Sequence, residues 1–245
     1  MTYCVAVNLN EGLVFASDSR TNAGVDHVSV YSKMHSFAWP GDRVFTLLSA
    51  GNLATTQSVI KRLKTDTQNG APSFLSVPTM TAAADYVGSV SAEVQRQQGT
   101  RDALNTNFEA TFLLGGQIGN ASPELFMIYP QGNYIHESFE HPFLQVGETK
   151  YGKPILDRVI QRSTPLELAA RCALVSLNST LRSNLTVGPP LELLVYRRDS
   201  LVEGQRLYLL EEDTFYRDMA ERWNEGLLSA LGNLPKFPWE RNIKS

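Results

Sequence analysis

Short apolar runs separated by turn residues dominate the first fifty residues of the chain. Residues 3–9 and 13–17 form two such runs around residues 10–12 (Asn-Glu-Gly), a sequence typical of hairpin turns. Two further runs cover residues 28–34 and 43–49. This pattern predicts four β-strands, of which the first two form a hairpin.

The rest of the chain alternates between helical and extended patterns. Val59, Ile60 and Leu63 are spaced for one buried helical stripe, with Asn52 as the expected N-cap. Thr164 is the expected cap of a later helix, because a proline and then an acid follow it. After residue 50 we therefore predict, in chain order, helices 52–63 and 79–97, strands 107–117, 125–129 and 134–135, helices 151–161 and 164–181, strands 191–196 and 207–210, and a last helix from Asp213.

Groups of strands thus alternate with pairs of helices along the chain. Two stacked sheets, each covered by a helix layer, accommodate this order, so we predict an α+β protein with a four-layer αββα sandwich. Since no repeat, low-complexity segment or linker interrupts the 245 residues, we expect one domain over residues 1–245.

Composition narrows the range of partners. Charged residues make up only 19% of the chain, below the usual quarter, which predicts extensive covered surface, part of it covered by other subunits. The net charge of −3 argues against nucleic-acid binding, and the chain has no apolar run long enough to cross a membrane.

The cysteines and histidines indicate the cellular compartment and whether a metal site is expected. Cys4 and Cys172 form no disulfide framework, and no signal peptide precedes the first strand, so we expect a cytoplasmic protein. The histidines show no metal-ligand spacing, and no glycine-rich phosphate loop is present, so neither a metal nor a cofactor is expected. The histidines, for which surface or interface roles are the default, are His27, His35, His136 and His141.

The second residue offers a nucleophile. Removal of Met1 would leave Thr2 with a hydroxyl and a free α-amine on one residue. The amine can act as the base that activates the hydroxyl, and its reference pKa of about 7.7–8.0 leaves part of it neutral at cytosolic pH. Cys4 is the alternative nucleophile, but its place inside an apolar strand favours a buried structural thiol.

A nearby cation would lower the pKa of that amine. Lys33 could supply the cation if Asp18, at the end of the second strand, keeps it charged and fixed. A unit charge about 4 Å away is worth roughly 4 kcal/mol at an effective dielectric near 20. The three residues are therefore chemically sufficient, whether the amine or Lys33 finally holds the hydroxyl proton.

The order of these residues is similar to that of proteasome β-type subunits, which are N-terminal-nucleophile hydrolases. Thr2 is followed by Ala-Ser-Asp-Ser-Arg at residues 16–20, by Lys33, and by Leu-Ser-Ala-Gly-Asn at residues 48–52. The resemblance implies that Thr2 is the nucleophile, Asp18 the orienting acid and Lys33 the activating lysine. It further implies an oxyanion hole at the Gly51 backbone N–H and a substrate pocket lined by Asn22 and Ser49.

Within that family the chain resembles the bacterial ancestral-β-subunit (Anbu) group, whose members begin Met-Thr-Tyr without a propeptide. The group carries a C-terminal extension, here a helical segment over residues 213–245. Two segments depart from the wider family's pattern. Where the family has Gly-Ser-Gly, this chain has Glu148 and Thr149 after Gly147. Where the family has a late Asp-x-x-Ser-Gly, this chain has hydroxyl side chains but no acidic residue. The residues at these positions that could orient the amine are Glu148, Thr149, Ser183 and Thr186.

Three functions fit these observations. The first is a threonine hydrolase that cleaves peptide or amide bonds through an acyl-enzyme. The second is an assembly subunit with vestigial machinery that acts as a scaffold or compartment, and the third is an amidase for a small metabolite conjugate. In each case the large apolar residues between 227 and 239 predict a homo-oligomer, either a closed ring or an open helical array.

Overall fold

The structure is a computed structural model of the chain and describes residues 2–22, 28–70, 72–100 and 106–242. It contains two compact units, Met1–Leu209 and Leu210–Ser245. Among the described residues, no helix combines the length and the apolarity needed to cross a membrane.

Two five-stranded antiparallel sheets form the centre of the first unit. The first sheet has the order β10-β1-β2-β11-β12, and its strands are β1 (Tyr3–Leu9), β2 (Gly12–Asp18), β10 (Phe143–Gly147), β11 (Leu191–Arg197) and β12 (Gln205–Leu209). The second sheet has the order β5-β6-β7-β8-β9, and its strands are β5 (Met34–Trp39), β6 (Arg43–Gly51), β7 (Ala110–Ile118), β8 (Glu124–Ile128) and β9 (Tyr134–His136). The short strands β3 (Arg20–Asn22) and β4 (Val28–Val30) pair separately.

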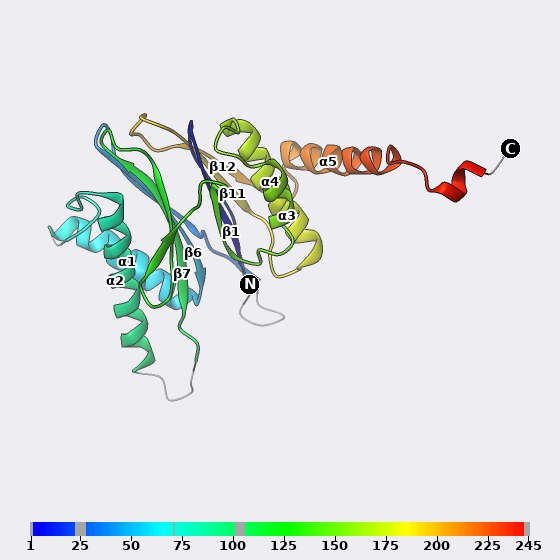
Figure 1. Cartoon of the computed structure of the whole chain (residues 1–245). Coiled ribbons are helices and arrows are strands. Elements are labelled where there is room, and N and C mark those ends of the chain that lie inside the picture. Colours follow the sequence, from blue (N-terminus) through cyan, green and yellow to red (C-terminus); the bar gives the residue numbers. More distant parts are fainter. Residues whose placement is uncertain (1, 23–27, 71, 101–105, 243–245) are drawn as a thin grey trace. The chain divides into compact units, whose positions relative to one another are not determined.

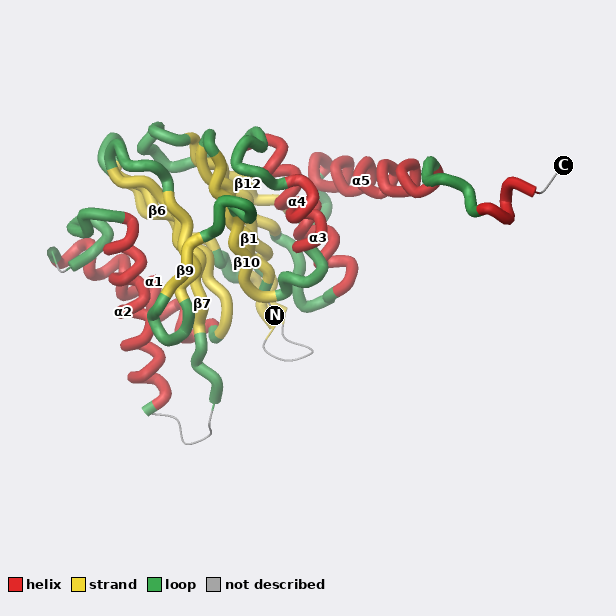
Figure 2. Tube along the Cα trace, in the orientation of Figure 1, coloured by secondary structure: helices red, strands yellow, loops and turns green. Residues whose placement is uncertain are grey.

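Helices cover the outer face of each sheet. Helices α1 (Leu53–Asn69) and α2 (Met80–Gly99) pack on the second sheet, and α3 (Lys153–Val159) and α4 (Leu166–Ser183) lie on the first. Figure 1 shows α1 and α2 beside β6 and β7, with α3 and α4 on the side of β1 and β11. Figure 2 shows the same helix and strand layers in the colours of their secondary structure.

Apolar residues fill two separate layers of this unit. One cluster joins α1 and α2 to the second sheet, and the other lies between the two sheets. The sheets approach closely where Phe15 faces Gly115, because a Cβ on Gly115 would lie 2.6 Å from the Phe15 ring. The predicted αββα sandwich is confirmed.

The N-termini of α1 and α4 differ in how their first backbone N–H groups are capped. Asn52 Oδ1 accepts a hydrogen bond from Thr55 N at 3.2 Å, as predicted for the N-cap of α1. The predicted cap Thr164 is wrong, because its hydroxyl accepts from Gln161 N at 2.9 Å instead. The first turn of α4 receives a distant partner in its place: Leu166 N donates to a carboxylate oxygen of Glu11 at 3.2 Å.

Several strand predictions were also wrong. Residues 28–34 do not form one strand, since β4 ends at Val30 and β5 begins at Met34. Strands β3 and β10 were not predicted, and neither was β5 beyond Met34. In β5 the buried positions are three residues apart, so the segment lacks the alternation of a half-buried strand.

The second unit contains helix α5 (Thr214–Gly232) and the short 3-10 helix η1 (Pro238–Asn242). Asp213 caps α5 as predicted, accepting from Tyr216 N at 3.1 Å. Phe237 and Trp239 stack on each other with ring centroids 4.6 Å apart. The described residues of this unit leave its large apolar side chains uncovered, with exposures of 59% to 66% at Leu228, Leu231, Leu234, Phe237 and Trp239.

Candidate active site

The end of β2 carries a buried ion pair. Lys33 Nζ donates to Asp18 Oδ1 at 2.6 Å and to the backbone oxygen of Arg20 at 2.7 Å. Asp18 is 0% exposed and Lys33 is 7% exposed. Since a buried charge is tolerated only with partners, each group fixes the position of the other.

Asp18 is also held by backbone donors. Tyr3 N donates to Oδ1 at 3.0 Å, and Gly188 N lies 3.4 Å from Oδ2. Burial raises the pKa of the Asp18 carboxyl, while the Lys33 ammonium and these two N–H groups act in the opposite direction. Because Lys33 and Tyr3 share one carboxylate oxygen, the ammonium is held next to the backbone that follows Thr2.

Thr2 is fixed by the end of β10. Its backbone oxygen accepts from Glu148 N at 2.8 Å. Gly147 has a φ of +85°, and a Cβ there would lie 1.8 Å from the Thr2 oxygen. A side chain at residue 147 would therefore displace Thr2, which explains a glycine at this position.

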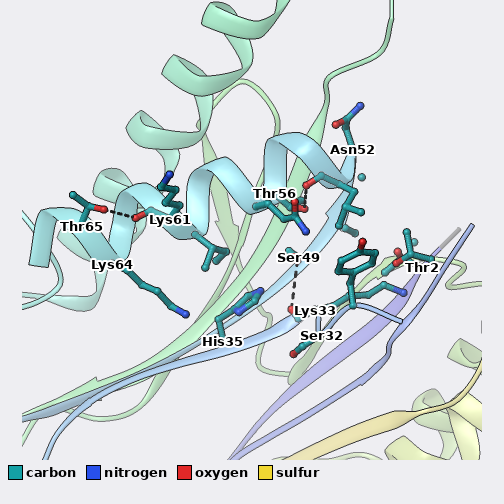
Figure 3. A pocket seen from close by; sticks show the side chains of 18 of the residues that line it. Thr2, Ser32, Lys33, His35, Ser49, Asn52, Thr56, Lys61, Lys64 and Thr65 are labelled. Atoms are coloured by element: carbon teal, nitrogen blue, oxygen red, sulfur yellow. Dashed lines mark hydrogen bonds between the residues drawn. The ribbon is translucent and has the colours of Figure 1, made fainter. Parts of the chain in front are cut away.

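A cleft of about 1040 Å³ opens beside Thr2. Of the residues predicted to form the site, Thr2, Lys33, Ser49, Gly51 and Glu148 all line it. Figure 3 shows the Lys33 side chain extended toward Thr2, with Ser49 next to Lys33 and α1 along one wall. Asp18 lies behind Lys33 and reaches the cleft only through that side chain.

Gly51 ends β6 and leads into α1. Its φ is +114°, and a Cβ at this position would lie 2.3 Å from the backbone oxygen of Glu109. Only glycine fits this turn, which brings residues 51–53 to the wall of the cleft. The start of a helix carries N–H groups without intrahelical partners, so this wall suits a negatively charged oxygen.

The other predicted residues whose side chains the structure describes are not among those that line this cleft. Thr149 lines two other depressions, both of which Gln145 also lines. Ser183 is exposed at the last residue of α4, and Thr186 donates its hydroxyl to Asn184 Oδ1 at 2.6 Å. The backbone of Asn22 belongs to β3, but its side chain lies outside the described residues, as does all of His27.

The alternative nucleophile Cys4 is a buried thiol. Its Sγ lies 3.8 Å from the backbone oxygen of Ser49, and burial raises the pKa of the Cys4 thiol strongly. A thiol with a raised pKa carries little thiolate and is unreactive. Within the described residues, no group of three His, Cys, Asp or Glu side chains could hold a metal ion.

Sequence reasoning missed the far part of the cleft. His35 on β5 and the α1 residues Lys61 and Lys64 line it, beyond Ser49. Burial, Lys64 and Arg206 lower the pKa of His35 to about 4. The spacing of Gln57, Lys61 and Lys64 along one helix face was visible in the sequence, but such a face is usually solvated rather than the wall of a cleft.

Comparison with known proteins agrees with this geometry. The family model described as "Proteasome subunit" matches residues 2–195. The chain is 45% identical to Anbu from Yersinia bercovieri over 96% of this chain and 99% of that one, with a TM-score of 0.92. It is 48% identical to the protein in the helical assembly of the Anbu complex from Pseudomonas aeruginosa, over 98% and 100% of the two chains, with a TM-score of 0.93.

Anbu from Hyphomicrobium sp. strain MC1 is 41% identical over 96% of this chain and 99% of that one, with a TM-score of 0.88. No match was found among curated protein sequences. The match to the family model covers well over half of the chain, and each solved structure is covered almost completely. The chain therefore belongs to the proteasome β-type subunit family, in its bacterial ancestral-β-subunit (Anbu) group.

Proposed function

We propose that this proteasome-type subunit is a threonine hydrolase that cleaves peptide or small amide bonds with Thr2 after removal of Met1. The observation that carries the proposal is the meeting of three groups at one cleft. These are Thr2, the Lys33 ammonium fixed by Asp18, and the turn at Gly51.

The reaction needs a nucleophile, a base and a site for negative charge. The Thr2 hydroxyl oxygen attacks the carbonyl carbon of the amide, and the Thr2 α-amine takes the hydroxyl proton. The Gly51 N–H stabilises the oxyanion that forms. The amine then returns the proton to the departing nitrogen as the C–N bond breaks, and water hydrolyses the ester left on Thr2.

Lys33 makes the amine a better base in this scheme. A fixed positive charge disfavours protonation of a neighbouring amine and so lowers its pKa. Asp18 keeps the ammonium in place by accepting its hydrogen bond at 2.6 Å. Glu148, whose backbone N–H binds the Thr2 oxygen, lies on the cleft wall where its carboxylate can orient the amine.

Intact-mass spectrometry and kinetics test the proposal. We expect the purified protein to have lost the mass of Met1, and Thr2 to react with an electrophilic β-lactone. The rate should rise with pH through an apparent pKa at or below about 7.7–8.0, that of a free α-amine. Thr2→Ala should abolish both labelling and turnover, while Lys153→Ala, at an α3 lysine that pairs with Asp157 outside the cleft, should leave them intact.

The same experiment separates the alternatives. Complete retention of Met1 with no labelling would favour an assembly subunit that acts as a scaffold. Labelling at Thr2 with turnover of small amides but not of peptides would favour a small-metabolite amidase.

We further propose that the protein is a homo-oligomer. The support is the apolar tail of the second unit, which the described residues of that unit leave uncovered, and the helical assembly of the Pseudomonas aeruginosa relative. Replacing Leu228, Leu231 and Leu234 by Gln should lower the mass measured by ultracentrifugation. Leu185→Gln is the control, because Leu185 is 86% exposed in the first unit.

We place the protein in the cytoplasm. Cys4 and Cys172 are both buried and unpaired, as suits a reducing compartment. Cell fractionation against a periplasmic marker would test this location.

A further inference from the structure

One face of α1 forms a wall of the cleft along almost the whole helix. The residues that line it recur every three or four positions from Leu53 to Gln68, including Gln57, Lys61 and Lys64. At 1.5 Å per residue this wall is about 22 Å long. An extended peptide rises about 3.3 Å per residue, so the wall spans between about six and seven residues of substrate.

Two positive charges at the far part of this wall have no ion-pair partner among the described residues. In the described part of the chain, no carboxylate lies within salt-bridge distance of Lys61 or Lys64, and both are exposed. The acid that lies near them in sequence, Asp66, is engaged on another side of α1. Its two oxygens bind Arg62 Nε at 2.8 Å and the Tyr86 hydroxyl at 2.9 Å.

Within the described residues, the facing wall supplies no free carboxylate near these lysines either. His35, on β5, lies opposite Lys64 of α1, and the lowered pKa of the His35 imidazole keeps it neutral at pH 7. Glu192, behind Ser32, binds both the Ser32 hydroxyl and Arg206, with the Arg206 nitrogen at 2.5 Å. Glu148 lies at the Thr2 end of the cleft, 3.8 Å from Lys150.

We infer that the cleft selects substrates with an acidic residue a few positions from the cleaved bond, bound by Lys61 and Lys64. This inference rests on the proposed function, since it assigns the substrate class of the same cleft. The two lysines begin about 12 Å along α1 from Leu53, which is beyond the side chain of the residue that Thr2 attacks. An acidic substrate residue a few positions away from the cleaved bond can therefore reach the two lysines.

The chemistry favours a carboxylate on a peptide. Two lysines in a protein of net charge −3 create a local positive field that attracts an isolated anionic side chain. The polar residues beside them, Gln57, Thr65 and Gln68, can bind the backbone of an extended chain. A polyanion such as a nucleic acid would need a much larger basic surface.

Binding to the full-length Thr2→Ala protein tests the inference without any need for turnover. The probes are fluorescein-labelled hexapeptides of one neutral sequence, with Glu or Gln at each of the six positions in turn. We expect at least one Glu peptide to bind about tenfold more tightly than its Gln counterpart in fluorescence anisotropy. The preference should shrink in 0.5 M NaCl because salt screens exposed charges.

Variants assign the preference to the two lysines. Lys61→Gln with Lys64→Gln should remove it, and Lys64→Glu should reverse it toward Lys-containing peptides. Lys153→Gln, a lysine on α3 that pairs with Asp157 outside the cleft, is the matched control and should keep it.

Equal affinity for the Glu and Gln peptides at all six positions would overturn the inference. So would a change of oligomeric state in the double variant without a change of peptide affinity, because the lysines would then face another copy of the chain. A Glu preference in a protein that shows no turnover would reject the proposed hydrolase and leave the charge preference standing. Turnover without any preference would reject the charge preference alone.

Discussion

Lys33 and Lys64 line the same cleft, but their surroundings differ in burial and in partners. Lys33 is 7% exposed, its Nζ donates to Asp18 Oδ1 and to the Arg20 oxygen, and its side chain lines the cleft. Lys64 is exposed and has no carboxylate partner among the described residues. One lysine is part of the fold, whereas the other is available to a ligand.

This difference separates two uses of charge. Burying an ion pair costs desolvation free energy, so a buried lysine is held in one geometry by its partners and can act on a fixed neighbour. An exposed lysine keeps its water and its freedom, and it contributes to recognition rather than to stability. Substitution of Lys33 should therefore lower stability and the reaction rate, whereas substitution of Lys64 should change ligand binding with little effect on stability.

Lys33→Ala should have the largest effect. It leaves Asp18 buried without its ammonium, which costs about 3–5 kcal/mol of the free energy of unfolding. The rate of a Thr2-dependent reaction should fall on the order of 10³-fold. Urea unfolding and kcat/KM measure the two effects, with Lys153→Ala as a control that costs less than about 1 kcal/mol.

Lys33→Arg sharpens the same test, because it keeps the charge. A planar guanidinium cannot occupy the site of a compact ammonium between Asp18 and the Arg20 oxygen, so the rate should stay low even where stability partly recovers. A fully active arginine variant would contradict the role assigned to Lys33.

Gly51→Ala should have the next largest effect, at the Thr2 end of the cleft. The new Cβ would lie 2.3 Å from the Glu109 oxygen on a backbone with φ +114°, so we expect a loss of about 3 kcal/mol in thermal or urea unfolding. Gly70→Ala is the control. Its φ is +67° and nothing lies within 4 Å of the new Cβ, so the loss should be about 1 kcal/mol. Equal losses would show that the turn at residue 51 is not tightly packed.

His35, between the two ends, should make stability depend on pH. Its pKa is 6.5 in the unfolded chain and about 4 in the folded protein, where burial, Lys64 and Arg206 oppose the charged form. Between these values only the unfolded chain binds the proton, so the free energy of unfolding falls as pH falls from 6.5 to 4. The loss from this group is about 2–3 kcal/mol. Urea unfolding of His35→Gln should lack this part of the acid loss, and parallel pH curves for both proteins would refute it.

Lys61→Gln combined with Lys64→Gln should have the smallest effect on stability. Neither lysine has an ion-pair partner among the described residues, so the free energy of unfolding should change by less than about 0.5 kcal/mol. A loss similar to that of Lys33→Ala would mean that these lysines are structural. Differential scanning calorimetry at pH 7 measures the change.

The sandwich could be predicted because most of its elements carry local signals. The β1–β2 hairpin has a turn between two apolar runs, and Asn52 and Asp213 cap their helices with their own side chains. Thr164 misled the prediction, since the α4 terminus is satisfied by Glu11, more than 150 residues away. A cap supplied from a distant turn leaves no pattern near the helix.

The missed strands have the same origin. Strand β10 pairs with β1 at the Tyr3–Gly147 end, and its residues become extended because that partner is present. Strand β5 combines buried and half-buried positions without alternation, since its pairing with β6 rather than its own pattern sets its backbone. Such segments are decided by pairing over long sequence separations.

The sequence by itself determined the chemical identities at the Thr2 end. A threonine after Met1, an acid at a strand end, a lysine and a glycine before a helix were all present in the expected order. The geometry of their meeting came from tertiary structure, through the shared Asp18 oxygen and the close approach of Gly147 to Thr2. Ser183 and Thr186 do not line the cleft, and their role in orienting the amine stays a prediction.

Only the tertiary structure revealed the far end of the cleft. Lys61 and Lys64 follow the spacing of an ordinary solvated helix face, and nothing local distinguishes them from other surface lysines. Their significance depends on β5 lying opposite and on the absence of a described carboxylate beside them. A reactive group is defined by its own chemistry, whereas a binding surface is defined by its neighbours, and those are set by folding.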